Sequence, residues 1–209
     1  MIAAGNGILA NALKASQEVN AALNGAAPLT TVFPNSGIGN QLGQVAKIIQ
    51  VRAALGANRQ IFFCGMGGFD THTNLLPDQD NLLAQLDPAL GAFYSATQEL
   101  GVEQNVVTFT ESEFGRTGQP STGAGSDHGW GSHHIMMGGP VKGGEAYGTF
   151  PTLALQGPDD TDNRGVWIPT TSLDQYAATF ASWFGLSDAD LNIVFPNLIN
   201  FGAPKLGFL

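Results

Sequence analysis

The stretch QIFFCGMGGFDTHTN, residues 60–74, joins a short apolar run to two glycines, an aspartate and a histidine. A continuous apolar run of this length, rich in aromatic residues, is typical of a strand that is covered on both faces in a parallel sheet. In open α/β sheets, functional sites lie at the carboxyl ends of the strands. The stretch therefore predicts a buried strand at 60–65 that delivers Asp70 and His72 to a site.

Two further apolar runs, at 105–110 and 135–139, predict two more strands. We expect the runs 60–65 and 105–110 to be neighbours, with their carboxyl ends directed at the same loops. The order strand, helix, strand, loop, strand, helix indicates an α/β fold with a parallel sheet. The prediction is one α/β domain over residues 1–209, with three layers and a mostly parallel sheet flanked by helices. Residues 1–36 are expected to be a weakly structured or helical N-terminal extension.

Apolar residues recur at helical spacing in two of the expected helices, about 37–55 and 79–100. The expected helices cover 8–24, about 37–55, 79–100, 172–185 and a short segment from Ser187 to before Pro196. Gly56 suits the C-cap of the second helix. Pro88 is expected to kink or restart the third helix, and Ser172 with Gln175 forms a capping box that starts the fourth.

The composition excludes several classes of protein. The 209 residues are 43% hydrophobic and 12% charged, which argues against disorder. Eight Lys and Arg face 17 Asp and Glu, for a net charge of -9, so a nucleic-acid partner is not expected. No run is long and apolar enough to span a membrane, and the first residues lack the pattern of a signal peptide. The single cysteine, Cys64, excludes an intrachain disulfide.

All four histidines lie in loops next to the expected strands, together with acidic residues and an arginine. The first loop holds Asp70 and His72, and TESEFGRT (110–117) holds Ser112, Glu113 and Arg116. The third loop, SDHGWGSHH (126–134), contributes Asp127, His128, His133 and His134.

Carboxylates and imidazoles together are the ligands of zinc, manganese and similar divalent ions, and mixed Asp/His sets mark catalytic sites. Each part also has a simpler interpretation. Asp70 can cap a helix, His72 can be a surface histidine, and Glu113 can pair with Arg116. His133 and His134 would point in opposite directions if a strand begins there, so only one of them is expected to be a ligand.

Four ordered segments resemble a large bacterial family of uncharacterised proteins, usually exported by the twin-arginine route and grouped with the alkaline phosphatase and sulfatase superfamily. They are GGFDTH, TESEFGRTG, SDHGWGSHHIMMGGPVKGGEAYG and TTSLDQYAATFASWFG. The resemblance covers about residues 40–200. It implies an alkaline-phosphatase-like fold in which aspartates and histidines hold two metals, and a Ser, Thr or modified Cys attacks a phosphate or sulfate ester.

By this resemblance, Asp127 and His128 match the Asp-His metal pair, and His133 or His134 matches the final metal histidine. Asp70 and His72 match the earlier acid–histidine pair, with a spacing of one residue in place of three. The family's early strand, ending in Gly-Gly-x-Asp-Gly, has no counterpart before residue 60. The chain is therefore expected to be the C-terminal half of the fold, truncated at its N-terminus.

The resulting expectation is a metal-dependent hydrolase of ester-type bonds. Asp70, His72, Asp127, His128 and one of His133 and His134 would hold the ion: zinc, or alternatively calcium, manganese or magnesium. Phosphate or sulfate esters follow from the resemblance, and a carboxyl ester or lactone needs the same activated water. Glu113 would be a general base or a partner of a histidine, and Arg116 would hold an anionic group of a small-molecule substrate.

Ser112 or Thr71 is the alternative nucleophile to a metal-activated water. The alternative function is a non-catalytic, metal-stabilised binding or assembly module. An unpaired sheet edge predicts a homodimer. The resemblance implies a periplasmic or exported location; the absence of a signal peptide would otherwise indicate the cytoplasm.

Overall fold

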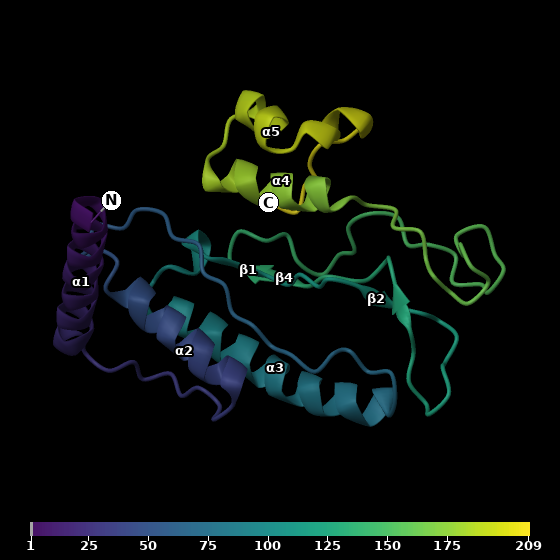
Figure 1. Ribbon diagram of the computed structural model, residues 1–209, viewed down its shortest axis with the longest axis horizontal. Helices are drawn as coiled ribbons and strands as arrows, with labels where there is room; N and C mark the ends of the chain where they lie inside the picture. The colour runs from purple at the N-terminus through teal and green to yellow at the C-terminus, as the bar shows by residue number, and fades with distance from the viewer. Residues whose placement is uncertain (1) are drawn as a thin grey trace. The chain divides into compact units, whose positions relative to one another are not determined.

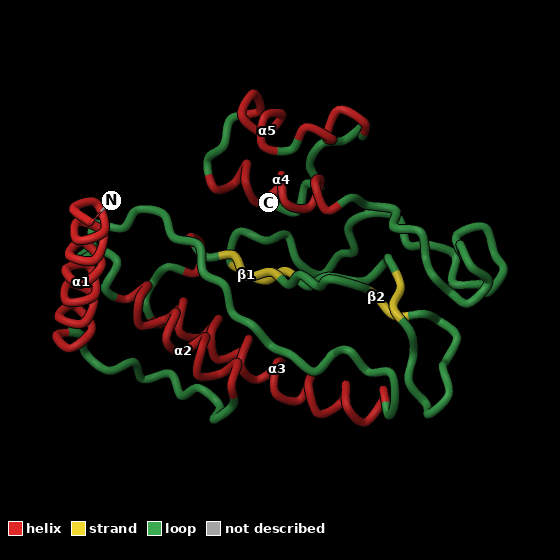
Figure 2. Tube along the Cα trace, in the orientation of Figure 1, coloured by secondary structure: helices red, strands yellow, loops and turns green. Residues whose placement is uncertain are grey.

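The computed structural model describes residues 2–209, which group into two compact units where the sequence predicted one domain. The first unit runs to Gly67 and resumes over Leu83–Val102, and the second comprises Gly68–Leu82 and Glu103–Leu209. Helices dominate the first unit. The second unit holds all the strands of the described residues, and most of its chain is loop (Figure 2).

The first unit contains α1 (Ile2–Gly25), α2 (Gly37–Gln50) and the greater part of α3 (Leu75–Glu99), which are labelled in Figure 1. The N-cap of α2 is Ser36, whose hydroxyl accepts a hydrogen bond from the Gly39 amide. Its C-cap is Val51, five residues before Gly56. α3 continues through Pro88 without a second start. The expected helices are thus present, but a fresh start at Pro88 and the predicted C-cap at Gly56 are wrong.

The apolar residues of α2 and α3 provide the core of this unit. α2 buries one face through Ile38, Leu42, Val45, Ala46 and Ile49. α3 buries Ala89, Phe93 and Ala96. The spacing of three and four residues is the one that lines up side chains on one helical face.

The apolar run 60–65 is not a strand, which contradicts its prediction from the sequence. The side chains of Ile61 and Phe63 are 82% and 94% exposed. A strand requires a hydrogen-bonding neighbour. In the described residues the Gly65 backbone instead pairs with a side chain: its N–H donates to the Gln41 amide oxygen (2.9 Å) and its carbonyl accepts from the Gln41 amide nitrogen (2.8 Å).

The second unit contains two antiparallel ladders. β1 (Val107–Phe109) pairs with β4 (Met136–Gly138), with Phe109 opposite Met136. β2 (Gly115–Arg116) pairs with β3 (His128–Gly129). Two of the three expected strands are therefore present, but they pair antiparallel. A three-layer parallel sheet is not seen in residues 2–209, and the alkaline-phosphatase-like fold stays a prediction.

α4 (Leu173–Phe184) covers the β1–β4 ladder. Its predicted capping box between Ser172 and Gln175 is confirmed, and it ends at Gly185 with φ 112°. Tyr176 and Phe180 form a cluster with Phe208, against which Val107 and Met136 pack. The remaining elements are the short η1 (Glu103–Asn105), then α5 (Asp188–Val194), which contacts α4, and finally η2 (Pro196–Asn200).

Among residues 2–209, no helix combines the length and the apolar character needed to cross a bilayer.

A carboxylate at the end of α3 holds the loop after α1. Glu99 accepts hydrogen bonds from the amides of Thr30 (2.6 Å) and Thr31 (2.8 Å), and from the Thr31 hydroxyl (2.6 Å). The Thr31 hydroxyl bond, followed by the backbone bonds, lowers the pKa of Glu99 from 4.5 to about 2. These bonds favour the charged carboxylate, so the loop depends on ionised Glu99.

We expect Glu99→Gln to lower the melting temperature, and the loss to depend on pH. A folded-state pKa below the unfolded value gives stability that is present above pH 4.5 and is lost as the pH falls through about 2. The gap between wild type and variant should therefore be widest above pH 4.5 and should close towards pH 2. Melting curves across this range measure it, with the exposed Glu145→Gln as control. A gap that does not change with pH would contradict the assigned role.

Candidate metal centre

Two segments of the second unit build the site by pairing with each other. The Ser126 amide donates to the Thr71 carbonyl (3.1 Å), and the amides of Asn74 and Leu75 donate to the carbonyls of Gly123 and Ala124 (both 3.0 Å). A β-carbon on Gly125 would lie 1.9 Å from the His72 carbonyl oxygen, so only glycine permits this approach. The pairing brings Asp70 and His72 next to the segment that holds Asp127 and His128.

The β2–β3 ladder supplies the other side of the site. Its register places Arg116 opposite His128 and Gly115 opposite Gly129. A β-carbon on Gly115 would lie 1.9 Å from the Gly131 carbonyl oxygen. The Phe114 ring stacks on His128 with centroids 3.8 Å apart and an interplanar angle of 6°. The ladder and this stack orient the His128 imidazole.

Three potential ligands converge: Asp70, His72 and His128. Asp70 Oδ1 lies 2.8 Å from His128 Nε2 and 3.0 Å from His72 Nε2. The two Nε2 atoms are 3.3 Å apart. Each of the three side chains is 50–55% exposed, so the cluster is open to solvent and to a ligand.

The three donor atoms fit a zinc-like ion. Ligands bound at about 2.0–2.2 Å to a tetrahedral ion lie roughly 3.3–3.6 Å apart, so the observed contacts need to open by at most about 0.8 Å. Exposed side chains can make that change. Two imidazole nitrogens and one carboxylate oxygen also match the ligand number of catalytic zinc sites, which leave a position open.

Asp127 lies beside this cluster and orients it. Its Oδ1 is 3.5 Å from Nδ1 of His72, the ring nitrogen that faces away from the shared point. Metal-binding histidines commonly donate this second N–H to a carboxylate. Asp127 was predicted as a ligand; the structure places it behind His72 instead.

Arg164 was not among the residues that the sequence singled out. Its Nη2 lies 2.5 Å from Asp127 Oδ2, and its carbonyl accepts from the Gln119 amide (2.8 Å). The hydrogen bond from Arg164 is the largest cause of the lowered pKa of Asp127. Arg164 sits in the Gly- and Pro-rich segment 139–168, which has no apolar periodicity that could have indicated its position.

Arg116 has a structural role at the site. Its Nη1 lies 2.9 Å from Asp70 Oδ1, its Nε donates to the Ser126 hydroxyl (2.9 Å), and its Nη2 donates to the Ser126 carbonyl. Its side chain is 15% exposed. The hydrogen bond from His128, and then the one from Arg116, lowers the pKa of Asp70. His128 and Arg116 thus both favour the charged form of Asp70. Two of the five N–H groups of Arg116 are not used by its three hydrogen bonds.

His133 and His134 lie outside the cluster of Asp70, His72 and His128. His133 stacks on Phe150 with centroids 5.1 Å apart, and His134 stacks on Tyr176 at 5.5 Å. Burial lowers the pKa of His134. The expectation that one of them joins the other ligands is not met by this arrangement.

Two of the remaining predicted residues, Ser112 and Glu113, lie just before β2. The Ser112 hydroxyl donates to the Phe114 carbonyl (3.0 Å), and Glu113 is exposed next to Phe114. Thr71, the second candidate nucleophile, is 4% exposed. Ser112 and Glu113 are therefore exposed, whereas Thr71 is buried.

The chain belongs to the family described as "Protein of unknown function (DUF1501)", which matches residues 6–164. The match includes Asp70, His72, Arg116, Asp127, His128 and Arg164. A comparison with curated proteins and one with solved structures gave no match. The relation to the alkaline phosphatase and sulfatase superfamily and the export by the twin-arginine route stay predictions.

A series of variants should rank the residues by their part in metal binding. His128→Ala should abolish stoichiometric zinc binding, because two donors cannot complete the shell. Asp127→Asn should weaken zinc binding about 10–100-fold, which is typical of residues that orient a ligand. His133→Ala, the same change in a histidine outside the cluster, should leave zinc binding unchanged. Calorimetric titration with zinc measures all three.

Zinc binding by His128→Ala at wild-type affinity would remove His128 from the site. Equal losses in His128→Ala and His133→Ala would contradict the cluster as a whole.

Proposed function

We propose that the chain is a metal-dependent hydrolase of ester-type bonds. The observation that carries the proposal is the convergence of Asp70, His72 and His128, half exposed, on a shared point. Phosphate or sulfate esters are proposed from the family resemblance, and carboxyl esters and lactones share the required chemistry. Zinc is the proposed ion; manganese, magnesium and calcium are the alternatives.

A divalent ion at this point would polarise a substrate oxygen and lower the pKa of a water molecule to about 7. The chain's own residues set up the site. Asp127 Oδ1 lies 3.5 Å from Nδ1 of His72, on the side away from the shared point, and the Phe114 ring stacks on His128. Hydrogen bonds from His128 and then Arg116 lower the pKa of Asp70 and so favour its carboxylate form. The two remaining N–H groups of Arg116 can donate to an anionic group of the substrate.

Glu113 is the proposed general base. It is exposed and precedes Phe114, whose ring lies on His128. Ser112 is less suited to be the nucleophile, because its hydroxyl proton is donated to the Phe114 carbonyl. A water molecule is therefore the proposed nucleophile.

The second candidate function is a metal-stabilised binding or assembly module without catalysis. Two observations favour it: three of the Arg116 N–H groups are engaged within the chain, and the Ser112 hydroxyl is bonded to the backbone. Such a module would bind the ion through the same three residues. Both functions predict a bound ion, so only a measurement of ester hydrolysis distinguishes them.

If the hydrolase proposal holds, turnover of activated phosphate, sulfate and carboxyl esters should vanish with a chelator and return with zinc. Glu113→Gln should lower kcat about 10²–10⁴-fold, the contribution of a general base, while zinc stays bound. Ser112→Ala should change kcat little if water attacks. Steady-state kinetics with metal analysis of each variant measures this. Zinc-loaded protein that turns over no ester or lactone would leave the binding module as the function.

We also propose that the chain forms a homodimer. Ile61 and Phe63 expose neighbouring apolar side chains, a surface that a second copy would cover. Light scattering should give twice the chain mass of 21.8 kDa. Phe63→Ser should shift the mass towards the monomer, and Ile199→Ser, at an equally exposed residue elsewhere, should not. A monomeric wild type at high concentration would contradict the dimer.

A further inference from the structure

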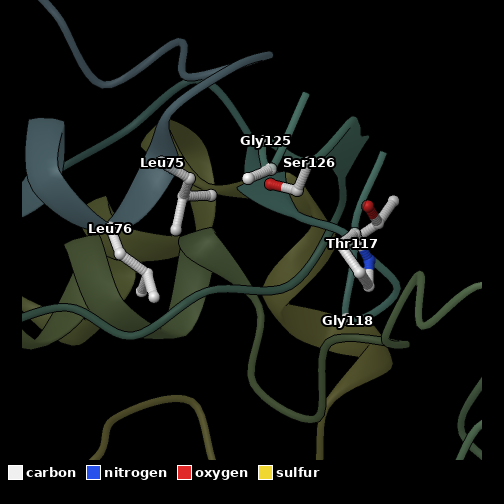
Figure 3. A pocket seen from close by; sticks show the side chains of 8 residues that line it. Leu75, Leu76, Thr117, Gly118, Gly125 and Ser126 are labelled. Atoms are coloured by element: carbon white, nitrogen blue, oxygen red, sulfur yellow. The ribbon is translucent and has the colours of Figure 1, made fainter. Parts of the chain in front are cut away.

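A pocket of about 300 Å³ lies in the second unit, between the start of α3 and the loop that follows β2. In Figure 3, Leu75 and Leu76 project from the start of α3, Thr117 and Gly118 lie across from them, and Gly125 and Ser126 lie between. Pro120 and Ala124 complete the lining. The wall is mainly apolar, and the Leu76 side chain is 77% exposed, so the pocket is accessible.

The pocket and the metal centre share the same two segments. The segment that provides Asp70 and His72 to the cluster continues directly into Leu75 and Leu76. Residues 116–128 contribute to both sites. The two ends of this segment, Arg116 and His128, lie at the cluster, and residues between them line the pocket. The backbone pairing of residues 71–75 with residues 123–126 therefore fixes the position of the pocket relative to the metal centre.

Ser126 connects the two sites. It lines the pocket, and its hydroxyl and carbonyl accept hydrogen bonds from Arg116. The same guanidinium contacts Asp70 at 2.9 Å. The arginine that borders the metal centre is therefore one hydrogen bond away from the pocket wall.

We propose that this pocket is the subsite for the apolar part of the substrate, an alkyl or aryl group of about six carbons or more. The proposal rests on the hydrolase function above, which puts the oxyanion of the ester at the metal centre. A cavity of about 150 Å³ holds a benzene molecule, so the pocket has room for a group of that size. A leucine-lined pocket, with Arg116 joined to its wall by hydrogen bonds to Ser126 and to the candidate ligand Asp70, fits an amphiphilic anion.

The chemistry of the lining separates this ligand from a wholly polar one. Sugar or nucleotide groups need several hydrogen-bonding side chains, because their buried polar atoms must be paired. Two polar side chains line this pocket, Thr117 and Ser126, and both are engaged within the chain. The Thr117 hydroxyl donates to the Gln119 carbonyl and accepts from the Asp127 amide. The lining therefore favours a hydrocarbon group.

The test compares methylphosphonate with hexylphosphonate as probes, by calorimetric titration into zinc-loaded and zinc-free full-length protein. Each buried methylene is worth about fourfold in Kd, so partial burial of the hexyl chain should tighten binding at least about tenfold over methyl. In Leu76→Ser this gain should fall below about threefold. Leu83→Ser, at an exposed leucine of α3 outside the pocket, should keep the full gain.

Equal affinities of the two phosphonates in the wild type would overturn the proposal, and so would a full gain in Leu76→Ser. The zinc-free titrations keep this result separate from the hydrolase function. If no zinc binds, the metal centre fails, while a hexyl gain that depends on Leu76 still supports the apolar subsite. If zinc binds without a hexyl gain, only the subsite fails.

Discussion

A single carboxylate oxygen organises the candidate site. Asp70 Oδ1 lies within 3.0 Å of two imidazole nitrogens and a guanidinium nitrogen. This arrangement is favourable only while Asp70 carries its negative charge, and the hydrogen bonds from His128 and Arg116 lower its pKa accordingly. The three ligands now contact one another at hydrogen-bonding distances. A divalent ion bound between them would replace these hydrogen bonds, because it supplies positive charge at the same point. His72, His128 and Arg116 all contact this one group.

The backbone brings these residues together by close approaches that side chains would prevent. Gly125 lets residues 123–126 pair with 71–75, and Gly115 lets the β2–β3 ladder pass the Gly131 carbonyl. The glycine-rich loops are therefore ordered parts of the site. The same pairing also builds the apolar pocket around Leu75 and Leu76, which connects the proposed chemistry with the proposed choice of substrate.

Local signals allowed most elements to be predicted from the sequence. Helical spacing indicated α2 and α3, and the capping box indicated the start of α4, because these features depend on neighbouring residues. Strand pairing depends on distant residues, and so the partner and the direction of β1 and β4 were not predictable. The run 60–65 shows this most clearly: it has the composition of a buried strand but no strand partner in the described residues.

Local signals also allowed part of the site to be predicted, and the part that depends on distant residues was missed. Asp70, His72 and His128 were singled out by residue type and by position beside apolar runs, and the structure brings them together. His133 and His134 share these signals, yet they stack on Phe150 and Tyr176, because ring packing depends on the tertiary fold. Arg164 and the role of Asp127 behind His72 were missed, because an ion pair across 37 residues leaves no local pattern.

The four imidazoles of the chain allow one direct test of the metal centre. Nitrogen-15 NMR spectra of the histidine rings, recorded during a zinc titration, report each ring nitrogen that becomes a ligand. The structure predicts that His72 and His128 bind zinc through Nε2, while the rings of His133 and His134 keep their resonances. Coordination by His133 or His134, or four unchanged rings at excess zinc, would contradict the proposed centre.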